Sequence, residues 1–84
     1  MIETFIKANK LSFKKGNRNS TITTLVGYAQ HLNITKTKLL AGIGEQVFTD
    51  SFIKEEVDRL WPYCAEHNYK EFWTTKEASK RYKF

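Results

Sequence analysis

The sequence predicts a mainly α-helical fold of four or five short helices in one domain, residues 1–84. Hydrophobic residues make up 40% of the chain and aromatic residues 14%, which is enough for a packed core and unlike the composition of disordered chains. Apolar side chains recur at helical spacing over most of the chain beyond residue 20. Residues that cap helices stand ahead of these stripes, so their positions indicate where each helix begins.

The N-terminal region leaves two folds open. Apolar residues near the start fall at helical spacing and predict a short helix: Ile2, Phe5 and Ile6. Leu11 and Phe13 instead alternate as in a strand, and a polar run containing Gly16 follows them. Because residues 21–26 are rich in β-branched side chains, a β-hairpin over residues 10–26 is the alternative, and it would give an α+β fold.

A longer helix is predicted from residue 20 onward. Five apolar residues fall on one of its faces: Ile22, Leu25, Val26, Ala29 and Leu32. Ser20 or Thr21 can cap its start, since a hydroxyl oxygen accepts a hydrogen bond from a free N–H of the first turn. Thr35 can cap the next helix in the same way. The apolar stripe of that next helix is Leu39, Leu40, Ile43 and Val47, and Gly42 and Gly44 weaken its end.

Two further helices are predicted in the second half. One opens at Thr49–Ser51, and its apolar side chains are Ile53, Val57, Leu60 and Trp61. Pro62 must kink or end this helix, because proline lacks the N–H donor and clashes with the preceding turn. In the other helix, Thr74 and Glu77 have the spacing of a capping box. Basic residues follow near its C-terminal end: Lys80, Arg81 and Lys83.

The net charge of +5 is concentrated in the N-terminal half. Residues 1–42 contain seven Lys and Arg against the single acid Glu3, whereas residues 43–84 contain seven basic and eight acidic residues. A directional positive field of this kind attracts polyanions. The charge therefore favours an anionic partner, nucleic acid first, which can be DNA or RNA.

A small residue, a turn former and a helix cap follow one another in the middle of the chain. Ala29 would let two helices cross closely, and Asn33 is the non-glycine residue best able to take a left-handed conformation. Thr35 would cap the second helix, with apolar packing from Leu32, Ile34 and Leu39. Over residues 25–43 this pattern resembles the helix-turn-helix motif of bacterial and phage DNA-binding proteins. Gly42 departs from it, since the family prefers an aliphatic residue there, and so do the two lysines of the reading face, Lys36 and Lys38.

The resemblance implies that the first turn of the second helix enters a major groove. The residues expected to contact bases and phosphates are Thr35, Lys36, Thr37 and Lys38. Three cations of the loop ahead of the preceding helix would contact the phosphate backbone: Lys14, Lys15 and Arg18. Together with Lys36 and Lys38 they would mostly supply affinity and salt dependence rather than sequence specificity. We expect these three side chains to be solvated and without ion-pair partners, because Glu3 is the one acid in the first half.

A second set of candidates lies in the C-terminal third, where aromatic rings alternate with cations. Single-stranded nucleic acids are held by rings that stack on bases and by lysines that follow the backbone. These secondary candidates are Tyr69, Lys76, Lys80, Arg81 and Tyr82. We assign Phe72 and Trp73 to the core instead.

The sequence predicts neither catalysis nor a cofactor. His31 and His67 are isolated, and with the single cysteine, Cys64, they cannot complete a usual zinc site. We expect Cys64 to be an inert, partly buried thiol. The prediction is therefore a protein without enzyme activity, catalytic residue, metal or cofactor.

These observations favour a non-enzymatic helix-turn-helix-type regulator that binds nucleic acid. The alternative is an RNA-binding antitoxin-like protein, or a phage-type inhibitor that blocks a host toxin, nuclease or other host factor by direct binding. The small size and basic charge are generally similar to those of early or host-takeover proteins of tailed phages. No apolar run is long enough to cross a bilayer, so we expect a cytoplasmic protein without membrane contact, in the host cytoplasm if it is viral. The oligomeric state stays open, and a homodimer is one option.

Overall fold

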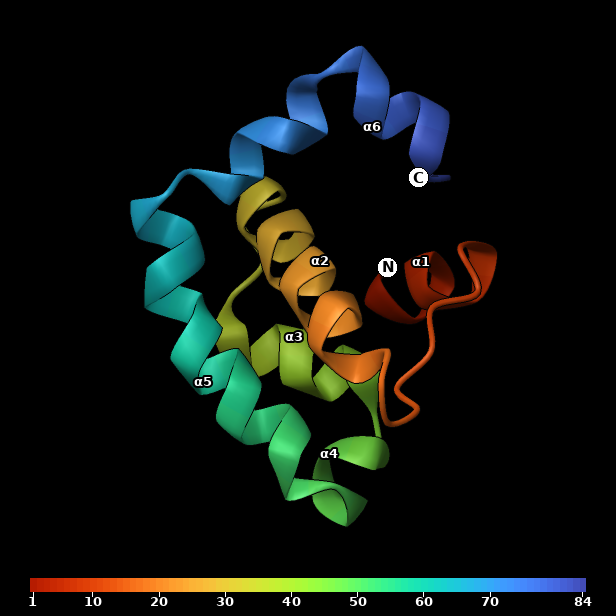
Figure 1. The fold of residues 1–84 in the computed structure, drawn as a ribbon, viewed down its shortest axis with the longest axis vertical. Helices are drawn as coiled ribbons and strands as arrows, with labels where there is room; N and C mark the ends of the chain where they lie inside the picture. Colours follow the sequence, from red (N-terminus) through yellow and green to blue (C-terminus); the bar gives the residue numbers. More distant parts are fainter.

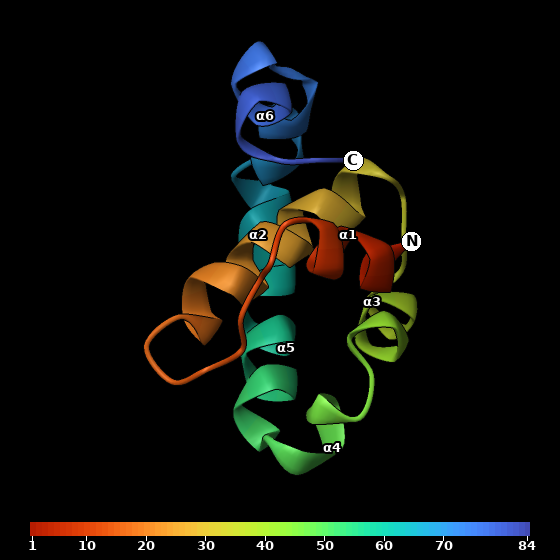
Figure 2. The ribbon, with the colours of Figure 1, turned by 90° about the vertical axis from the view of Figure 1, so that its right-hand side faces the viewer.

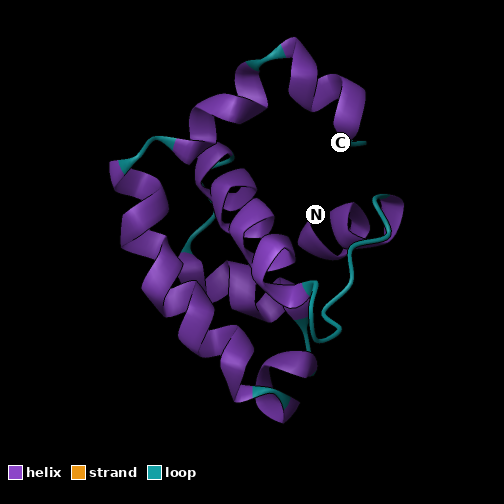
Figure 3. Ribbon diagram, in the orientation of Figure 1, coloured by secondary structure: helices purple, strands orange, loops and turns teal.

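Helices account for all the regular secondary structure of the protein, whose computed structural model describes residues 1–84 (Figures 1 and 3). The α-helices are α1 (Ile2–Ala8), α2 (Arg18–His31), α3 (Lys36–Ile43), α4 (Gln46–Thr49), α5 (Ser51–Glu66) and α6 (Lys76–Arg81), and a 3-10 helix, η1, spans Tyr69–Thr74. The prediction of a mainly α fold is confirmed. All five predicted helices are present, but the helix predicted to include Val47 ends at Ile43, and Val47 lies on α4. The short helices α4 and η1 were not predicted from the periodicity.

The alternative of an N-terminal β-hairpin is wrong. After α1 the chain runs to α2 as an irregular segment, and α2 includes the β-branched residues of 21–24. Thr21 and Ile22 are buried on α2, and the Thr21 hydroxyl donates a hydrogen bond of 2.7 Å to the carbonyl oxygen of Ser12. Packing of these side chains outweighs their β propensity.

The start of α2 also lies earlier than predicted. Asn17, rather than Ser20 or Thr21, occupies the N-cap position, and it makes no side-chain capping bond. The Ser20 hydroxyl donates to the carbonyl oxygen of Asn17 at 3.0 Å. It therefore binds the backbone of its own helix instead of capping it.

The core is built around α2, which packs along α5 and also contacts η1 and α3. Figures 1 and 2 show α5 along one side of α2 and α3 behind it. The fully buried apolar side chains of α2 meet those of α5. They are Ile22, Leu25, Val26 and Ala29 on α2, and Ile53, Val57 and Cys64 on α5. Cys64 is thus completely buried, and burial raises the pKa of its thiol. No helix is both long and apolar enough to span a bilayer.

Helix α1 packs against α3 at an unusually close contact. A Cβ atom added to Gly42 would lie 2.6 Å from the Cβ of Ile2, which is far inside van der Waals contact. Ile2 is itself buried in the core. This contact explains why Gly42 departs from the helix-turn-helix pattern, since an aliphatic side chain at this position would collide with α1.

Helix α5 continues through Pro62 to Glu66, so the proline does not end it. As predicted, the helix opens with a cap, because Oδ1 of Asp50 accepts a hydrogen bond of 3.1 Å from the backbone N–H of Phe52. The amide Nε2 of Gln30 donates to the carbonyl oxygen of Trp61 at 2.8 Å and ties α2 to α5 just before the proline. The helix ends before Asn68, whose φ of 55° is left-handed.

The predicted capping box of the last helix is displaced by one residue. Thr75, not Thr74, caps α6 by accepting a hydrogen bond of 3.3 Å from the N–H of Ala78. Thr74 closes η1, and its hydroxyl donates to the carbonyl oxygen of Glu71. Glu77 is consequently too early in α6 to complete the box and pairs with Arg81 at 3.1 Å.

A cluster of aromatic rings joins the two ends of the chain to α2. Trp73 is 5% exposed and contacts the rings of Phe5, Tyr28 and Tyr82 at centroid distances of 5.6, 5.0 and 4.9 Å. The assignment of Trp73 to the core is therefore confirmed, and Phe72 is half-buried against it. Asn9 fastens the C-terminal segment beside α1, since its amide donates to the carbonyl oxygen of Lys83 and accepts from the N–H of Lys83.

Candidate nucleic-acid interface

The turn between α2 and α3 has the local geometry that the sequence predicts. Asn33 is left-handed with a φ of 58°, and Ala29 is fully buried where the helices meet. The N–H of Ile34 donates to the carbonyl oxygen of Ala29 at 2.8 Å, which closes the end of α2. Thr35 caps α3, because its hydroxyl oxygen accepts from the N–H of Lys38 at 3.2 Å.

Asn33→Gly is expected to leave the protein as stable as before or to stabilise it by up to ~1 kcal/mol. Glycine takes a left-handed conformation without strain, and the Asn33 side chain makes no hydrogen bond that would be lost. Thermal melting of the two proteins measures this. A clear fall in melting temperature would show that the side chain supports the turn after all.

The outer face of α3 presents three of the four predicted contact residues. Thr35, Thr37 and Lys38 are exposed, while Leu39 is fully buried and anchors the helix. Lys38 forms no ion pair, so its ammonium group is available to an anion. The neighbouring residue on this face, Ala41, is also exposed and small.

Lys36 differs from the other three because it is held by α5. Its Nζ lies 3.0 Å from Oδ1 of Asp58, and Lys54 binds the other carboxylate oxygen at 2.8 Å. Hydrogen bonds from Lys54 and Lys36 lower the pKa of the Asp58 carboxyl. Lys36 thus helps to fasten α3 to α5, and its charge is partly compensated.

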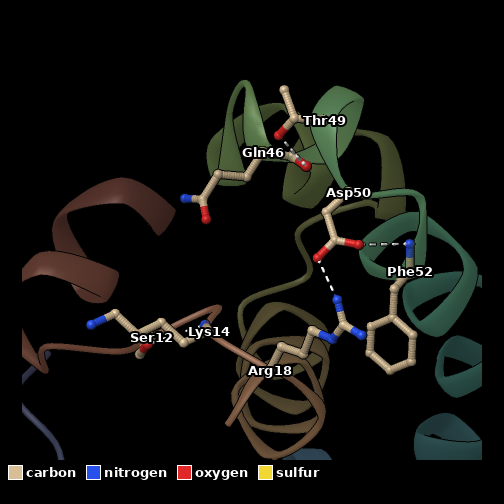
Figure 4. Close-up of polar contacts among 7 residues, drawn as sticks. All are labelled: Ser12, Lys14, Arg18, Gln46, Thr49, Asp50 and Phe52. Atoms are coloured by element: carbon tan, nitrogen blue, oxygen red, sulfur yellow. Dashed lines mark hydrogen bonds and ion pairs between the residues drawn. The ribbon is translucent and has the colours of Figure 1, made fainter. Parts of the chain in front are cut away.

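Arg18 contradicts the prediction of a solvated, unpaired cation. Figure 4 shows its guanidinium reaching Asp50, where Nη1 lies 2.7 Å from Oδ2, and covering the ring of Phe52 at 4.0 Å from the centroid. Only 25% of its side chain is exposed. The partner lies 32 residues away on the chain, so the scarcity of acids in the first half did not predict it. Arg18 joins the starts of α2 and α5.

Lys14 and Lys15 are exposed and unpaired, as predicted, but they do not lie beside α3. Figure 2 shows the loop that carries them at one edge of the molecule and α3 at the opposite edge. The candidate residues of the first half therefore divide into two surfaces. One surface is α3, and the other is the loop ahead of α2.

The structure brings together the two tyrosines among the secondary candidates. Tyr69 and Tyr82 line a hollow of about 620 Å³ between α2 and the η1–α6 segment. Arg81 is paired with Glu77, whereas Lys76 and Lys80 are exposed without ion pairs. Sequence analysis missed the α2 side of this hollow. The signal was a polar stripe of small residues at helical spacing: Ser20, Thr23, Thr24 and Gly27.

No three His, Cys, Asp or Glu side chains gather in a way that could hold a metal ion. Comparison with known proteins found no matching family model, no similar curated protein and no similar solved structure.

Proposed function

We propose that the protein is a non-enzymatic, helix-turn-helix-type regulator that binds DNA through α3. The observation that carries this proposal is the turn itself. A left-handed Asn33, a fully buried Ala29 and a Thr35 cap occur together, and the first turn of α3 beyond them is exposed. This is the part of the motif that enters a major groove.

The chemistry of the exposed face suits a duplex. The ammonium group of Lys38 can bind a phosphate or a guanine edge, and the threonines can donate to phosphates or contact thymine methyl groups. Because Lys36 is paired with Asp58, Lys38 is expected to contribute more to the binding of DNA than Lys36. The cytoplasm, of the host if the protein is viral, is the compartment where such a partner is available.

Lys38→Ala combined with Thr37→Ala is expected to weaken duplex DNA binding by about tenfold, or about 1.4 kcal/mol, and to lower the slope of log affinity against log salt by about one unit. Both residues are exposed, so the melting temperature should stay the same. Electrophoretic mobility shifts at two salt concentrations measure the binding.

The matched control is Lys14→Ala with Lys15→Ala, which removes two exposed cations from the other surface. If α3 is the interface, this control changes duplex affinity much less than the α3 variant. Equal losses of affinity in the two variants would show that binding depends on the overall positive charge. An unchanged affinity of the α3 variant would exclude α3 as the interface.

A second candidate function is an inhibitor that blocks a host toxin, nuclease or other factor by direct contact. It is favoured by Phe48, which is 90% exposed on α4 beside a hollow of about 370 Å³ that includes Leu40 and Val47. Exposed aromatic side chains of this kind are typical anchors of protein interfaces. Failure to bind duplex DNA, single-stranded RNA and structured RNA at low salt would favour this function over DNA regulation, and preference for RNA would favour the antitoxin-like variant.

A further inference from the structure

The hollow between α2 and the η1–α6 segment has the size and the walls of a small-ligand site. Its volume of about 620 Å³ falls in the range of roughly 300–1,000 Å³ found for ligand pockets. Rings from Tyr69, Phe72, Trp73 and Tyr82 form one side, and α2 forms the other. Gly27 lets the Trp73 indole pack directly on α2, because a Cβ there would lie 3.3 Å from Nε1 of Trp73.

The lining of this hollow is uncharged. All ten residues around it are polar without charge, aromatic or glycine. A phosphate, carboxylate or ammonium group inside it would lose hydration without gaining an opposite charge. The group that fits is therefore neutral, and the aromatic walls favour a flat ring that can stack.

Several polar groups of the lining can still donate or accept a further hydrogen bond. The indole N–H of Trp73 donates no hydrogen bond within the chain and is not fully sealed from solvent, although the residue as a whole is only 5% exposed and lies beside Gly27. The hydroxyls of Thr23 and Thr24 donate to the carbonyl oxygens of Asn19 and Ser20, each at 2.9 Å, so their oxygens remain acceptors. The carboxamide of Asn68 makes no hydrogen bond with the chain either and is exposed. This set matches the mixed donor and acceptor edge of a heteroaromatic ring.

We propose that this hollow binds a nucleobase, with the ring stacked on the aromatic wall and a ring acceptor facing the Trp73 indole N–H. Free nucleotides and unstacked bases of single strands both carry this group, and both leave the phosphate outside the hollow. Stacking on exposed rings is the usual way in which single strands are held. The site lies apart from α3 and does not depend on the duplex-binding proposal.

Titration of the ¹⁵N-labelled full chain with adenosine and uridine monophosphates, and separately with short single-stranded RNA, tests the proposal by NMR. The indole N–H resonance of Trp73 is expected to shift saturably, while that of Trp61, which lies outside the hollow, stays in place. A shift with the monophosphates identifies free nucleotides as sufficient ligands. A shift with the RNA alone identifies the strand as the source of the base.

Gly27→Ala is expected to weaken this binding by about tenfold, since its methyl group would press on the indole. Thr24→Val replaces a hydroxyl acceptor with a methyl group of the same shape and should also weaken the binding. It serves as the test if Gly27→Ala does not fold. Phe48→Ala, which removes an exposed ring elsewhere, and the Lys38 and Thr37 double variant should both keep the Trp73 shift. The proposal is overturned if no ligand shifts Trp73, if Trp61 shifts equally, or if both hollow variants fold and bind as well as the original chain.

Discussion

Trp73→Ala is expected to lower the free energy of unfolding by about 3–5 kcal/mol, the range for large aromatic side chains removed from a core. The indole is 5% exposed, and it contacts α1 through Phe5, α2 through Tyr28 and the C-terminal segment through Tyr82. Its loss removes the contact that these three parts share. A domain of this length has a total stability of about 4–13 kcal/mol. The variant is therefore expected to lose much of its stability and to be partly unfolded at 37 °C.

Urea denaturation followed by circular dichroism measures this effect. Phe48→Ala is the matched control, because it also deletes an aromatic ring but one that is 90% exposed; its change should stay within about 0.5 kcal/mol. A loss of less than about 1 kcal/mol for Trp73→Ala would mean that the aromatic cluster is not part of the stabilising core.

Gly42→Ala is expected to destabilise the protein by about 1–3 kcal/mol, as overpacked cores do. In most helices the same change stabilises by about 0.5–1 kcal/mol, because glycine has the greater freedom to lose. Here the added methyl group would lie 2.6 Å from the Cβ of Ile2. That atom is fixed to the backbone, so α1 itself must move away from α3.

A double-mutant cycle separates this collision from other effects of the substitution. Ile2→Ala removes the Cγ2 and Cγ1 atoms, which would lie 2.9 and 3.2 Å from the added methyl group, but it keeps the Cβ at 2.6 Å, so the relief should be partial when it is combined with Gly42→Ala. Ile2→Gly removes the Cβ, so the cost of Gly42→Ala should shrink in that background. Chemical denaturation of the single and double variants measures both couplings. If Gly42→Ala costs as much in the Ile2→Gly background as in the original chain, the close approach of α1 is excluded as the cause.

The local features of the helix-turn-helix pattern could be predicted because they depend on neighbouring residues. Asn33 and Thr35 act on backbone groups within a few positions of themselves, and the periodicity on either side located α2 and α3. The register of the last cap shows the limit of such reasoning. Thr74 and Thr75 are equally good caps, and the 3-10 helix that ends at Thr74 decided between them.

Which cations form ion pairs could not be predicted, because their acidic partners lie on elements that are distant in sequence. Arg18 and Lys36 both bind acids of the α5 region, Asp50 and Asp58, which lie far away in sequence. The aromatic hollow was only half foreseen for the same reason. Tyr69 and Tyr82 were selected by composition, whereas Gly27 acquires its meaning only when Trp73 is folded onto α2.

The rate at which Cys64 is alkylated can report how often the structure around it opens. Cys64 is the chain's single thiol and has no exposed surface, and its raised pKa keeps it in the unreactive protonated form. An alkylating reagent in the solvent can therefore reach it only in molecules in which the packing around α5 has transiently opened. The labelling rate under native conditions reports the free energy of that opening, so each variant can be ranked by mass spectrometry without denaturant.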